Sequence, residues 1–482
     1  MKLGALLDGI PVLTGDWDRD LEISGISYDT RSLTPGSLFV ALSGYRTDGH
    51  RFIGEALQKG AAAVLCLSVP KAAGPYLTVP DTRAALARVS ANWFGHPADG
   101  MTLLGVTGTN GKTTSTYLIK AVLEETLGAK VGLMGTNQNM IGSEALPAKR
   151  TTPESYEVQR LLRDMADAGC SHVVMEVSSH ALVLGRVNEL TFAAGVFTNL
   201  TQDHLDFHGS MEEYRRAKGL LFARSRVAVL NLDDEAGRYY AETVACKTFT
   251  YSENKDAADL TAKNLRLFPN QVAFEAVTMD GIARVMLPIP GGFSVYNALG
   301  TIAACLTLGI GLQAIANALA GAKGVKGRLE VLPVPAEFTV MVDYAHTPDA
   351  LENILTTLRD FTPGRLLCLF GCGGDRDRSK RGLMGGIALD LSDFVVITSD
   401  NPRTEPPEDI IADILTGLGE SKTPYRVIPD RRAAIRFALT QAKPGDTLLL
   451  AGKGHETYQE IAGLQQPFDE REEVRAYFEA GN

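Results

Sequence analysis

A glycine-rich turn between an expected strand and an expected helix constrains this chain more than any other feature. Residues 102–107 form a short, apolar and β-branched run, and residues 115–127 have the apolar spacing of a helix. Between them the sequence reads GTNGKTT, at residues 108–114. A loop of this kind at a helix N-terminus presents backbone N–H groups to phosphate oxygens. We therefore predict a nucleotide-phosphate site in an α/β fold.

The side chains of this turn indicate how the phosphates are held. Lys112 supplies a cation for the terminal phosphates, and the hydroxyl of Thr113 or Thr114 is suited to bind Mg²⁺. The match to the usual pattern GxxxxGK[ST] is imperfect, because Val106 occupies the position of the first glycine. We interpret the turn as a shortened variant of the loop. The alternative is a tight strand-to-helix turn that carries a surface lysine.

Composition narrows the class of protein. The chain has 482 residues, of which 45% are hydrophobic and 22% charged, and this is typical of a globular protein of about three domains. A formal charge of −10 argues against a nucleic-acid partner. The six cysteines are scattered without CxxC spacing, which indicates free thiols in a reducing compartment. We see neither a signal peptide nor a membrane span, and we expect a cytoplasmic protein.

Strand-like and helix-like runs alternate along the chain and divide it into three expected domains. Residues 1–98 read as a small α/β domain, residues 99–329 as a central ATP-binding domain, and residues 330–482 as a second parallel α/β unit that resembles a Rossmann domain. Residues 247–287 look rich in β-strands, and residues 321–327 read as a flexible linker. The predicted fold class is therefore α/β with three domains.

Polar side chains follow the expected strands of the central domain. Ligands of parallel sheets gather at the carboxyl ends of the strands. Glu176 lies at one such end, and its carboxylate is our first candidate for Mg²⁺. His204 and His208 follow the next strand and raise the alternative of zinc, but no thiolate or third histidine has convincing spacing. Lys218 lies in an expected helix, where a lone lysine usually faces solvent.

The last third of the chain repeats this arrangement. Expected strands at residues 338–343, 365–370, 394–398 and 446–451 each run into a polar loop. The loop that begins at Gly371 has the look of a dinucleotide-binding turn. However, a single glycine-rich turn is weak evidence, and a basic residue follows it where a ribose-binding acid would be expected.

With these residues in view, the sequence resembles the Mur ligase family of peptidoglycan synthesis over essentially its full length. The motifs that carry the resemblance occur in the family's order and read GTNGKTT, EVSSH, NLTQDHLDFHG, GRLE, DYAHTPD, GCGGDRDRSKR, DNPR and GKGHE.

The resemblance implies an ATP site with two Mg²⁺ ions. Residues implied to bind ATP are Gly108, Thr109, Asn110, Gly111, Lys112, Thr113, Thr114, Asn297, Arg328, Asp343 and His346. Residues implied to act in catalysis or at the metal ions are Lys112, Thr113, Glu176, His204 and Lys218. Lys218 stands where the family has a carbamylated lysine (N6-carboxylysine), an anionic oxygen ligand for the second Mg²⁺, and this reverses the expectation of a solvent-facing side chain.

The resemblance also implies the substrate-binding residues. Those expected at the uridine nucleotide are Tyr28, Thr30, Tyr45, Arg46 and Thr47. Those expected at the muramoyl-dipeptide are Thr151, Thr152, Ser178 and Arg186. Those expected at the incoming diamino acid are Arg376, Asp400, Asn401, Pro402, Arg403, Gly452 and Glu456. The chain departs from related sequences at Leu184, where Gln is frequent, and at Gly382, where Pro is common.

The implied activity is ATP-dependent addition of meso-diaminopimelate to UDP-N-acetylmuramoyl-L-alanyl-D-glutamate by a cytoplasmic monomer. In the family, DNPR accompanies diaminopimelate, whose distal carboxylate suits a bidentate guanidinium such as that of Arg403. Alternatives are the lysine-adding ligase of the same step and a folylpolyglutamate-synthase-like ligase. Outside the ligases, the alternatives are a P-loop motor or switch ATPase and a catalytically silent nucleotide-binding protein.

Overall fold

The computed structural model describes residues 1–480 except 16, 45–46, 72–73, 269–270, 360 and 420–421. The chain forms two compact units. The first comprises Met1–Gly105, Ala129–Ala193 and Leu220–Arg226, and the second comprises Val106–Gly128, Ala194–Gly219 and Val227–Asn482. The boundary between them passes within three strands, β5 (Thr102–Thr107), β10 (Phe192–Phe197) and β11 (Ser225–Asn231).

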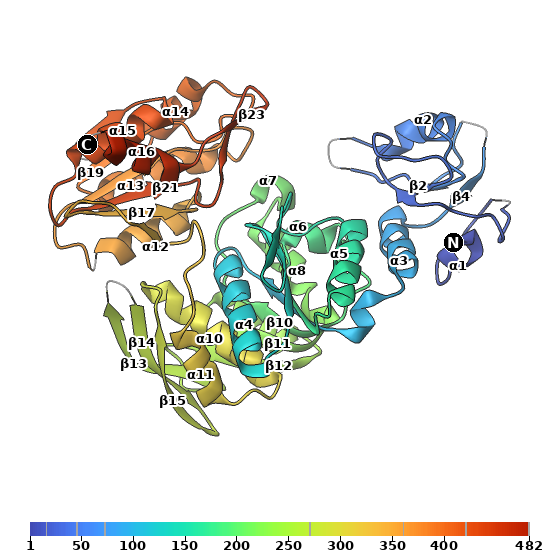
Figure 1. Ribbon diagram of the computed structural model, residues 1–482, viewed down its shortest axis with the longest axis horizontal. Helices are drawn as coiled ribbons and strands as arrows, with labels where there is room; N and C mark the ends of the chain where they lie inside the picture. Colours follow the sequence, from blue (N-terminus) through green and yellow to red (C-terminus); the bar gives the residue numbers. More distant parts are fainter. Residues whose placement is uncertain are drawn as a thin grey trace. The chain divides into compact units, whose positions relative to one another are not determined.

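The first unit begins with a small sheet whose strands are all parallel, in the order β1-β2-β3-β4 (Figure 1). Its strands are β1 (Ile26–Ser27), β2 (Leu38–Val40), β3 (Ala63–Cys66) and β4 (Tyr76–Thr78), and its helices are α1 (Leu3–Leu6), η1 (Gly49–Phe52), α2 (Ile53–Gln58) and α3 (Thr82–Phe94). Apolar side chains from β2, β3, β4 and α3 form its core. Helix α3 begins after Asp81, whose carboxylate accepts hydrogen bonds from two backbone N–H groups of the first turn.

The rest of the first unit contains the strand run β5-β9-β6-β7-β8. The elements are η2 (Pro97–Gly100), β6 (Val131–Met134), β7 (Asn139–Ile141), β8 (Glu144–Leu146), α5 (Ser155–Asp167), β9 (His172–Glu176) and α6 (Ser179–Val183). Strands β6 and β9 are parallel and almost wholly apolar, because both faces of the sheet are covered. Glu176 ends β9, so its side chain lies at the carboxyl edge of this sheet.

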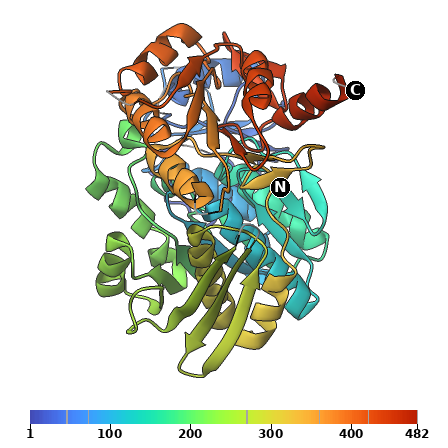
Figure 2. The ribbon, with the colours of Figure 1, turned by 90° about the vertical axis from the view of Figure 1, so that its left-hand side faces the viewer.

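The second unit begins with the strand run β15-β14-β13-β12-β11-β10. Its elements are α4 (Lys112–Leu127), α7 (Leu205–His208), α8 (Met211–Gly219), β11 (Ser225–Asn231), α9 (Glu235–Thr243), β12 (Lys247–Ser252), β13 (Leu260–Phe268), β14 (Gln271–Thr278), β15 (Gly281–Leu287), α10 (Gly292–Thr307) and α11 (Leu312–Ala320). The short helix η3 (Phe222–Arg224), between α8 and β11 in the chain, belongs to the first unit. Strands β12 to β15 form the β-rich segment expected at residues 247–287. Of these, β13, β14 and β15 make an antiparallel meander, shown in yellow-green beside α11 in Figure 2.

The second unit ends with a six-stranded sheet in the order β16-β17-β21-β18-β19-β20, parallel except for β16. Its strands are β16 (Glu330–Leu332), β17 (Thr339–Asp343), β18 (Leu366–Phe370), β19 (Phe394–Ile397), β20 (Tyr425–Val427) and β21 (Thr447–Ala451), with a hairpin of β22 (Tyr458–Ile461) and β23 (Leu464–Pro467). Its helices are α12 (Pro348–Arg359), α13 (Ser379–Leu391), α14 (Pro407–Leu415), α15 (Arg431–Gln441) and α16 (Glu470–Ala480).

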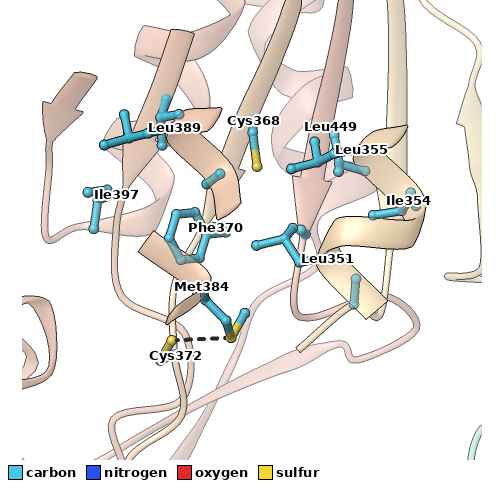
Figure 3. Packing of buried hydrophobic residues seen from close by; sticks show 14 of the residues in the cluster. Leu351, Ile354, Leu355, Cys368, Phe370, Cys372, Met384, Leu389, Ile397 and Leu449 are labelled. Carbon is cyan, nitrogen blue, oxygen red and sulfur yellow. Dashed lines mark hydrogen bonds between the residues drawn. The ribbon is translucent and has the colours of Figure 1, made fainter. Parts of the chain in front are cut away.

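Helices cover both faces of this last sheet, and β18 shows why. Cys368 and Phe370 point into a core formed with α12 and α13 (Figure 3), whereas Leu367 and Leu369 join a separate core with α15 and α16. A central strand buried on both sides must be apolar at every position, as β18 is. The α/β fold class predicted from the sequence is confirmed. Among the described helices, none has the length and apolar character needed to cross a bilayer.

Candidate active site

The glycine-rich turn joins β5 to α4, as predicted, but the helix begins at Lys112 rather than Ser115. Gly111 precedes the helix with a φ of 84°, in the left-handed region that favours glycine. A Cβ atom there would lie 2.4 Å from Oδ1 of Asn297. Lys112 folds back over the turn and donates hydrogen bonds to the carbonyl oxygens of Gly108 (2.9 Å) and Thr109 (2.7 Å). Because α4 begins at Lys112, its first turn contains the sequence Lys-Thr-Thr.

The segment after β10 holds the turn in shape. The backbone N–H of Asn110 donates to Oδ1 of Asn199 (2.8 Å), and the hydroxyl of Thr198 donates to the carbonyl oxygen of Asn110 (2.6 Å). The backbone N–H of Thr109 donates to the carbonyl oxygen of Asn199 (2.9 Å). These bonds join two neighbouring loops at the carboxyl edge of the sheet.

Lys218 on α8 is buried with only 1% of its surface exposed. Its Nζ donates to the carbonyl oxygen of Gly108 (2.8 Å) and lies 4.3 Å from the centre of the Tyr214 ring. Burial lowers the pKa of Lys218 well below its usual value, the nearby charge of Lys112 lowers it further, and Asp203 opposes the shift. The structure thus places a buried amine with a lowered pKa against the glycine-rich turn.

His204 lies in the adjacent loop in a left-handed conformation (φ 55°). Its backbone N–H donates to Oδ1 of Asp203 (2.9 Å), and its Nε2 lies 3.4 Å from Oδ2 of the same carboxylate. Burial opposes the ionisation of Asp203, but His204, His346 and Lys380 outweigh it and hold its pKa below the usual value. Within the described ranges, no three His, Cys, Asp or Glu side chains gather to hold a metal ion.

A cavity of about 390 Å³ adjoins the turn. Its polar lining includes Asn297, whose Oδ1 accepts a hydrogen bond from Ser115 (3.4 Å), and Tyr296, whose hydroxyl donates to Oδ2 of Asp233 (3.1 Å). Phe293 and Ile289 add apolar surface. A mixture of apolar walls with a few placed polar groups is typical of small-ligand sites.

Residues of the last sheet border the same cavity. Asp349 in the first turn of α12 accepts hydrogen bonds from Nδ2 of Asn110 (2.6 Å) and the hydroxyl of Thr201 (3.1 Å), and burial raises its pKa. Arg328 donates to the hydroxyl of Thr113 (3.2 Å). Arg328, which directly follows the linker at residues 321–327, therefore contacts the glycine-rich turn through its side chain. Sequence reasoning did not single out Asp349.

Two further predicted groups, Asp343 and His346, lie near the start of the last sheet. Asp343 accepts a hydrogen bond from the backbone N–H of Leu329 (2.7 Å), and burial raises its pKa. His346 is buried, which lowers its pKa to about 4, and the charge of Lys380 acts in the same direction. Its Nδ1 lies 2.7 Å from the carbonyl oxygen of Tyr344, so that nitrogen carries the proton and Nε2 is left as an acceptor.

A second polar cluster lies where β19 and β21 end. Asn401 donates from Nδ2 to Oε2 of Glu456 (2.8 Å), and Asp400 is 7% exposed beside Gly452, whose Cβ would lie 2.5 Å from Oδ2 of Asp400. Burial and the charge of Asp400 raise the pKa of Glu456, while Lys453 opposes them. The structure brings Asp400, Asn401, Gly452 and Glu456 together. Lys453, which we did not predict, joins them.

Arg403 lies in a left-handed conformation (φ 55°) beside this cluster. Its Nη1 donates to the carbonyl oxygen of Gly374 (2.7 Å), and its Nε lies 3.5 Å from Oε2 of Glu460. Pro402 approaches the same loop closely, since a Cβ on Gly374 would lie 1.9 Å from the Pro402 carbonyl oxygen. Arg376, from that loop, is exposed and donates to the carbonyl oxygen of Asp375 (3.2 Å).

A buried ion pair joins the loops that carry these two arginines. Arg381 is fully buried and donates through Nη1 and Nη2 to the Glu405 carboxylate (2.9 and 2.8 Å), and also through Nη1 to Asp413 (2.8 Å). Hydrogen bonding from Arg381 lowers the pKa of Glu405 to about 2. Glu405 accepts from the backbone N–H of Asp375 (2.6 Å). Neither Arg381 nor Glu405 was predicted, because an Arg in the first turn of α13 and a Glu in the loop before α14 carry no local signal.

The remaining predicted residues belong to the first unit. Glu176 is fully buried and accepts hydrogen bonds from the backbone N–H (2.8 Å) and the hydroxyl (2.9 Å) of Thr136. The same Thr136 oxygen lies 3.0 Å from the hydroxyl oxygen of Thr151, and the hydroxyl of Thr152 donates to the carbonyl oxygen of Glu176 (2.8 Å). The backbone N–H of Ser178 donates to the Thr152 hydroxyl (3.0 Å). These residues therefore form one cluster at the end of β9.

Arg186 extends this cluster and belongs to a group of guanidinium side chains. Its Nη1 donates to the carbonyl oxygen of Thr152 (3.0 Å), and burial lowers its pKa. Arg186 (3.3 Å), Arg83 (3.5 Å) and Arg150 (3.9 Å) all approach Oε2 of the buried Glu154. Three cations share one carboxylate, so positive charge is in excess there. Glu154 and Arg83 were not predicted.

Three of the residues expected at the uridine nucleotide, Tyr28, Thr30 and Thr47, lie in loops that adjoin the small N-terminal sheet. Tyr28 donates its hydroxyl to both oxygens of Glu157 (2.9 Å each), and burial together with that carboxylate raises its pKa. Thr30 is buried and Thr47 is exposed. Tyr45 and Arg46 lie outside the described residues.

The fold defines an α/β protein with a glycine-rich turn before α4 and a second, mostly parallel sheet that borders the cavity at this turn. Family models match along the chain: the Mur ligase family catalytic domain at residues 22–93, the Mur ligase middle domain at residues 106–305, and the Mur ligase glutamate ligase domain at residues 327–454. The chain belongs to the Mur ligase family and is a ligase.

Relatives cover nearly the whole chain. The UDP-N-acetylmuramoyl-L-alanyl-D-glutamate–2,6-diaminopimelate ligase of Clostridium tetani is 45% identical over 99% of both chains. The ligase of the same name from Caldanaerobacter subterraneus is 47% identical over 98% of both. A solved structure of a ligase with this name superposes with a TM-score of 0.70 at 35% identity, covering 100% of this chain and 99% of that one. A MurF ligase from Thermotoga maritima, solved with ADP, has a TM-score of 0.64 at 22% identity over 96% of this chain and 99% of that one, and shares the fold.

Proposed function

We propose that this chain is an ATP-dependent ligase that adds meso-diaminopimelate to UDP-N-acetylmuramoyl-L-alanyl-D-glutamate. The observation that carries the proposal is the near-full-length identity to ligases named for this reaction. The γ-phosphoryl group of ATP passes to the D-glutamyl γ-carboxylate to give an acyl phosphate. The amine of the diamino acid then attacks that carbonyl carbon, phosphate leaves, and the amine loses a proton as the amide forms.

The ATP site is proposed to be the cavity at the glycine-rich turn. Backbone N–H groups of residues 108–114 and the Lys112 ammonium hold the phosphates, which matches the positioning and charge neutralisation that phosphoryl transfer requires. Asn297 binds the adenine, and Arg328, Asp343 and His346 reach ATP from the linker and the last sheet. The cavity lining and the Arg328 contact with Thr113 support these roles.

Oxygen donors at this site suit Mg²⁺, which prefers hard ligands and retains waters. The Thr113 hydroxyl in the first turn of α4 would hold one ion, and Glu176 and His204 are proposed to lie near the metal sites. The ions would neutralise the charge that develops on the transferring phosphoryl group. The chain's own contribution is to fix these oxygen donors at the end of the sheet.

Lys218 is proposed to be carbamylated. The neutral amine attacks the carbon of CO₂, an N–C bond forms as one C–O π bond breaks, and the nitrogen releases one proton, so that the neutral amine becomes a carbamate anion. The burial of Lys218 and its lowered pKa support this reaction, since only the neutral amine is nucleophilic. The carbamate oxygens would serve as ligands for a second Mg²⁺.

The muramoyl-dipeptide is proposed to bind at Thr151, Thr152, Ser178 and Arg186, which the structure gathers around Glu176. The surplus of guanidinium groups there suits an acidic peptide. The uridine nucleotide is proposed to contact Tyr28, Thr30, Tyr45, Arg46 and Thr47.

The diamino acid is proposed to bind at Arg376, Asp400, Asn401, Pro402, Arg403, Gly452 and Glu456. The distal end of meso-diaminopimelate carries an ammonium and a carboxylate. Glu456 and Asp400 suit the ammonium, and the Arg403 guanidinium suits the carboxylate, which lysine lacks. We also propose the domain limits 1–98, 99–329 and 330–482, with residues 321–327 as the hinge between the last two domains. Closure about this hinge would bring ATP and the amino acid together and would exclude water from the acyl phosphate.

The test is an acceptor competition. Purified protein with ATP, Mg²⁺ and UDP-muramoyl-dipeptide receives meso-diaminopimelate, L-lysine or L-ornithine, and phosphate release and new peptide product are both followed. We expect product with meso-diaminopimelate far above the other two. Equal use of lysine would favour the lysine-adding ligase, and full ATP hydrolysis without any acceptor would favour a motor or switch ATPase. Glutamate addition to a folate would favour the folylpolyglutamate-synthase-like alternative.

A further inference from the structure

Lys453 is a completely buried lysine inside the cluster that we assign to the diamino acid. None of its surface is exposed. Its Nζ donates to Oδ1 of Asn401 (3.0 Å) and to Oε2 of Glu456 (2.9 Å), and it lies 5.6 Å from the centre of the Tyr458 ring. A lysine is rarely fully buried unless it is paired, so this placement calls for a reason beyond solubility or surface charge.

The lysine closes a small network between two loops. Asn401 follows β19, and its Nδ2 donates to the same Glu456 oxygen that accepts from Lys453 (2.8 Å). Oδ1 of Asn401 also accepts from the backbone N–H of Glu460 (2.9 Å). Lys453 and Glu456 follow β21. The ammonium therefore fixes both the amide orientation of Asn401 and the position of the Glu456 carboxylate.

The groups around Glu456 make the ionisation of its carboxyl depend on Lys453. The groups that face the Glu456 carboxylate are Lys453, Asn401, Asp400, Tyr344 and Tyr458. Asp400 is a second acid in the same cluster, and burial raises the pKa of Tyr344 and Tyr458. Burial and Asp400 both favour the protonated carboxyl of Glu456, whereas Lys453 and Asn401 favour the carboxylate. Lys453 is the cation in direct contact with Glu456 among the residues described.

We propose that Lys453 is a positioning residue that holds Glu456 as an oriented anion for the ammonium of the incoming diamino acid. This inference rests on the proposed function. The side chain of Lys453 acts through its hydrogen bonds with Asn401 and Glu456. Its role is to make a buried carboxylate available to a cationic substrate group.

The test is the pH dependence of diamino acid use in Lys453→Met and Lys453→Arg. In Lys453→Met, Glu456 should ionise only at higher pH. We expect KM for meso-diaminopimelate near pH 7 to rise about 10- to 100-fold, the size expected for a lost hydrogen bond between charged groups. The acid limb of kcat/KM should move to higher pH, so that activity recovers on the alkaline side. KM for ATP should stay unchanged. Lys453→Arg keeps the charge and should keep the acid limb of the parent enzyme.

Two controls make the outcome decisive. Lys443→Met removes an exposed lysine from the loop before β21 and should leave the profile unchanged. Glu456→Gln should remove the shifted limb, and adding Lys453→Met to it should cost little more, because both act on one carboxylate. If Lys453→Met fails to fold, as judged by loss of the thermal shift with ATP, Lys453→Gln takes its place.

The results separate the inference from the function on which it rests. A parent enzyme that forms no amide with meso-diaminopimelate would overturn the proposed function. A parent enzyme that forms it, with a loss in Lys453→Met that is the same at every pH or additive with Glu456→Gln, would overturn the role of Lys453 alone.

Discussion

Lys218 Nζ donates a hydrogen bond to the carbonyl oxygen of Gly108 across 2.8 Å, and this bond joins a buried amine on α8 to the glycine-rich turn. The amine lies within the second unit, close to Lys112, and two ammonium groups there would repel each other. A neutral amine at Lys218 relieves that repulsion and is the form that reacts with CO₂.

Lys218 should therefore take up CO₂ reversibly. With ¹³C-bicarbonate we expect a carbamate signal in the NMR spectrum of the parent protein and none in Lys218→Arg, together with a loss of ligase activity of about 100-fold or more. ATP binding should persist. Lys120→Arg is the matched control, since Lys120 is also buried but is paired with Glu124 (2.6 Å). A carbamate signal that survives in Lys218→Arg would contradict the assignment.

Gly111→Ala should weaken ATP binding. The φ of 84° disfavours any L side chain, by about 1 kcal/mol or more, and the added Cβ would also displace Asn297, whose Oδ1 lies 2.4 Å from that position. We expect the Kd for ATP, measured by isothermal titration calorimetry, to rise about tenfold or more. Gly128→Ala at the other end of α4 is the control: its φ is 60°, but nothing lies within 4 Å of the added Cβ. Equal effects of both variants on ATP binding would argue against the role of Gly111.

Arg403→Lys should weaken the use of the amino acid without affecting the use of ATP. A lysine keeps the charge but loses the planar fork that pairs with a carboxylate. We expect KM for meso-diaminopimelate to rise about 10- to 100-fold while KM for ATP is unchanged. Arg359→Lys, in a surface pair with Asp393 (2.8 Å), serves as the control. If Arg403→Lys impaired ATP and amino acid use equally, the assigned pocket would be rejected.

Arg381→Met should destabilise the last sheet. The variant leaves Glu405 and Asp413 without their buried partner, which costs about 3 kcal/mol or more in the free energy of unfolding. Urea denaturation measures the change. Arg378→Met removes a guanidinium that pairs with the same Asp413 (2.9 Å) but is 63% exposed, and it should cost about 1 kcal/mol or less. Similar losses in the free energy of unfolding of the two variants would show that burial of the guanidinium does not determine its contribution to stability.

Stability should fall in mild acid because of two histidines. The folded protein has lowered pKa values at His346 (about 4) and His455 (about 3), mainly through burial. The unfolded chain therefore binds more protons below about pH 6.5, and the free energy of unfolding decreases as pH drops from there toward these values. Each histidine contributes up to about 1.4 kcal/mol per pH unit in that range. The double variant His346→Gln/His455→Gln should flatten the dependence in urea titrations, and an unchanged slope would refute this account.

The local sequence determined the order and type of most elements. Strand and helix patterns depend on periodicity over a few neighbouring residues, so β5, the turn at residues 108–111 and the alternating elements of the last sheet were predictable. The start of α4 was placed three residues late, because Lys-Thr-Thr has no apolar spacing and its helical state comes from the turn before it. The strand ends of the last sheet also indicated which polar loops would meet.

Only the tertiary structure decided which of these side chains are buried and with whom. A helical lysine reads as exposed from its neighbours, yet Lys218 is buried because its partner lies 110 positions earlier in the chain. Lys453 gains its role from Asn401, 52 positions away, and Asp349 from Asn110, 239 positions away. Such contacts arise where separate loops meet at the edges of sheets. No periodicity along the chain records them, because burial and charge pairing depend on the packed arrangement as a whole.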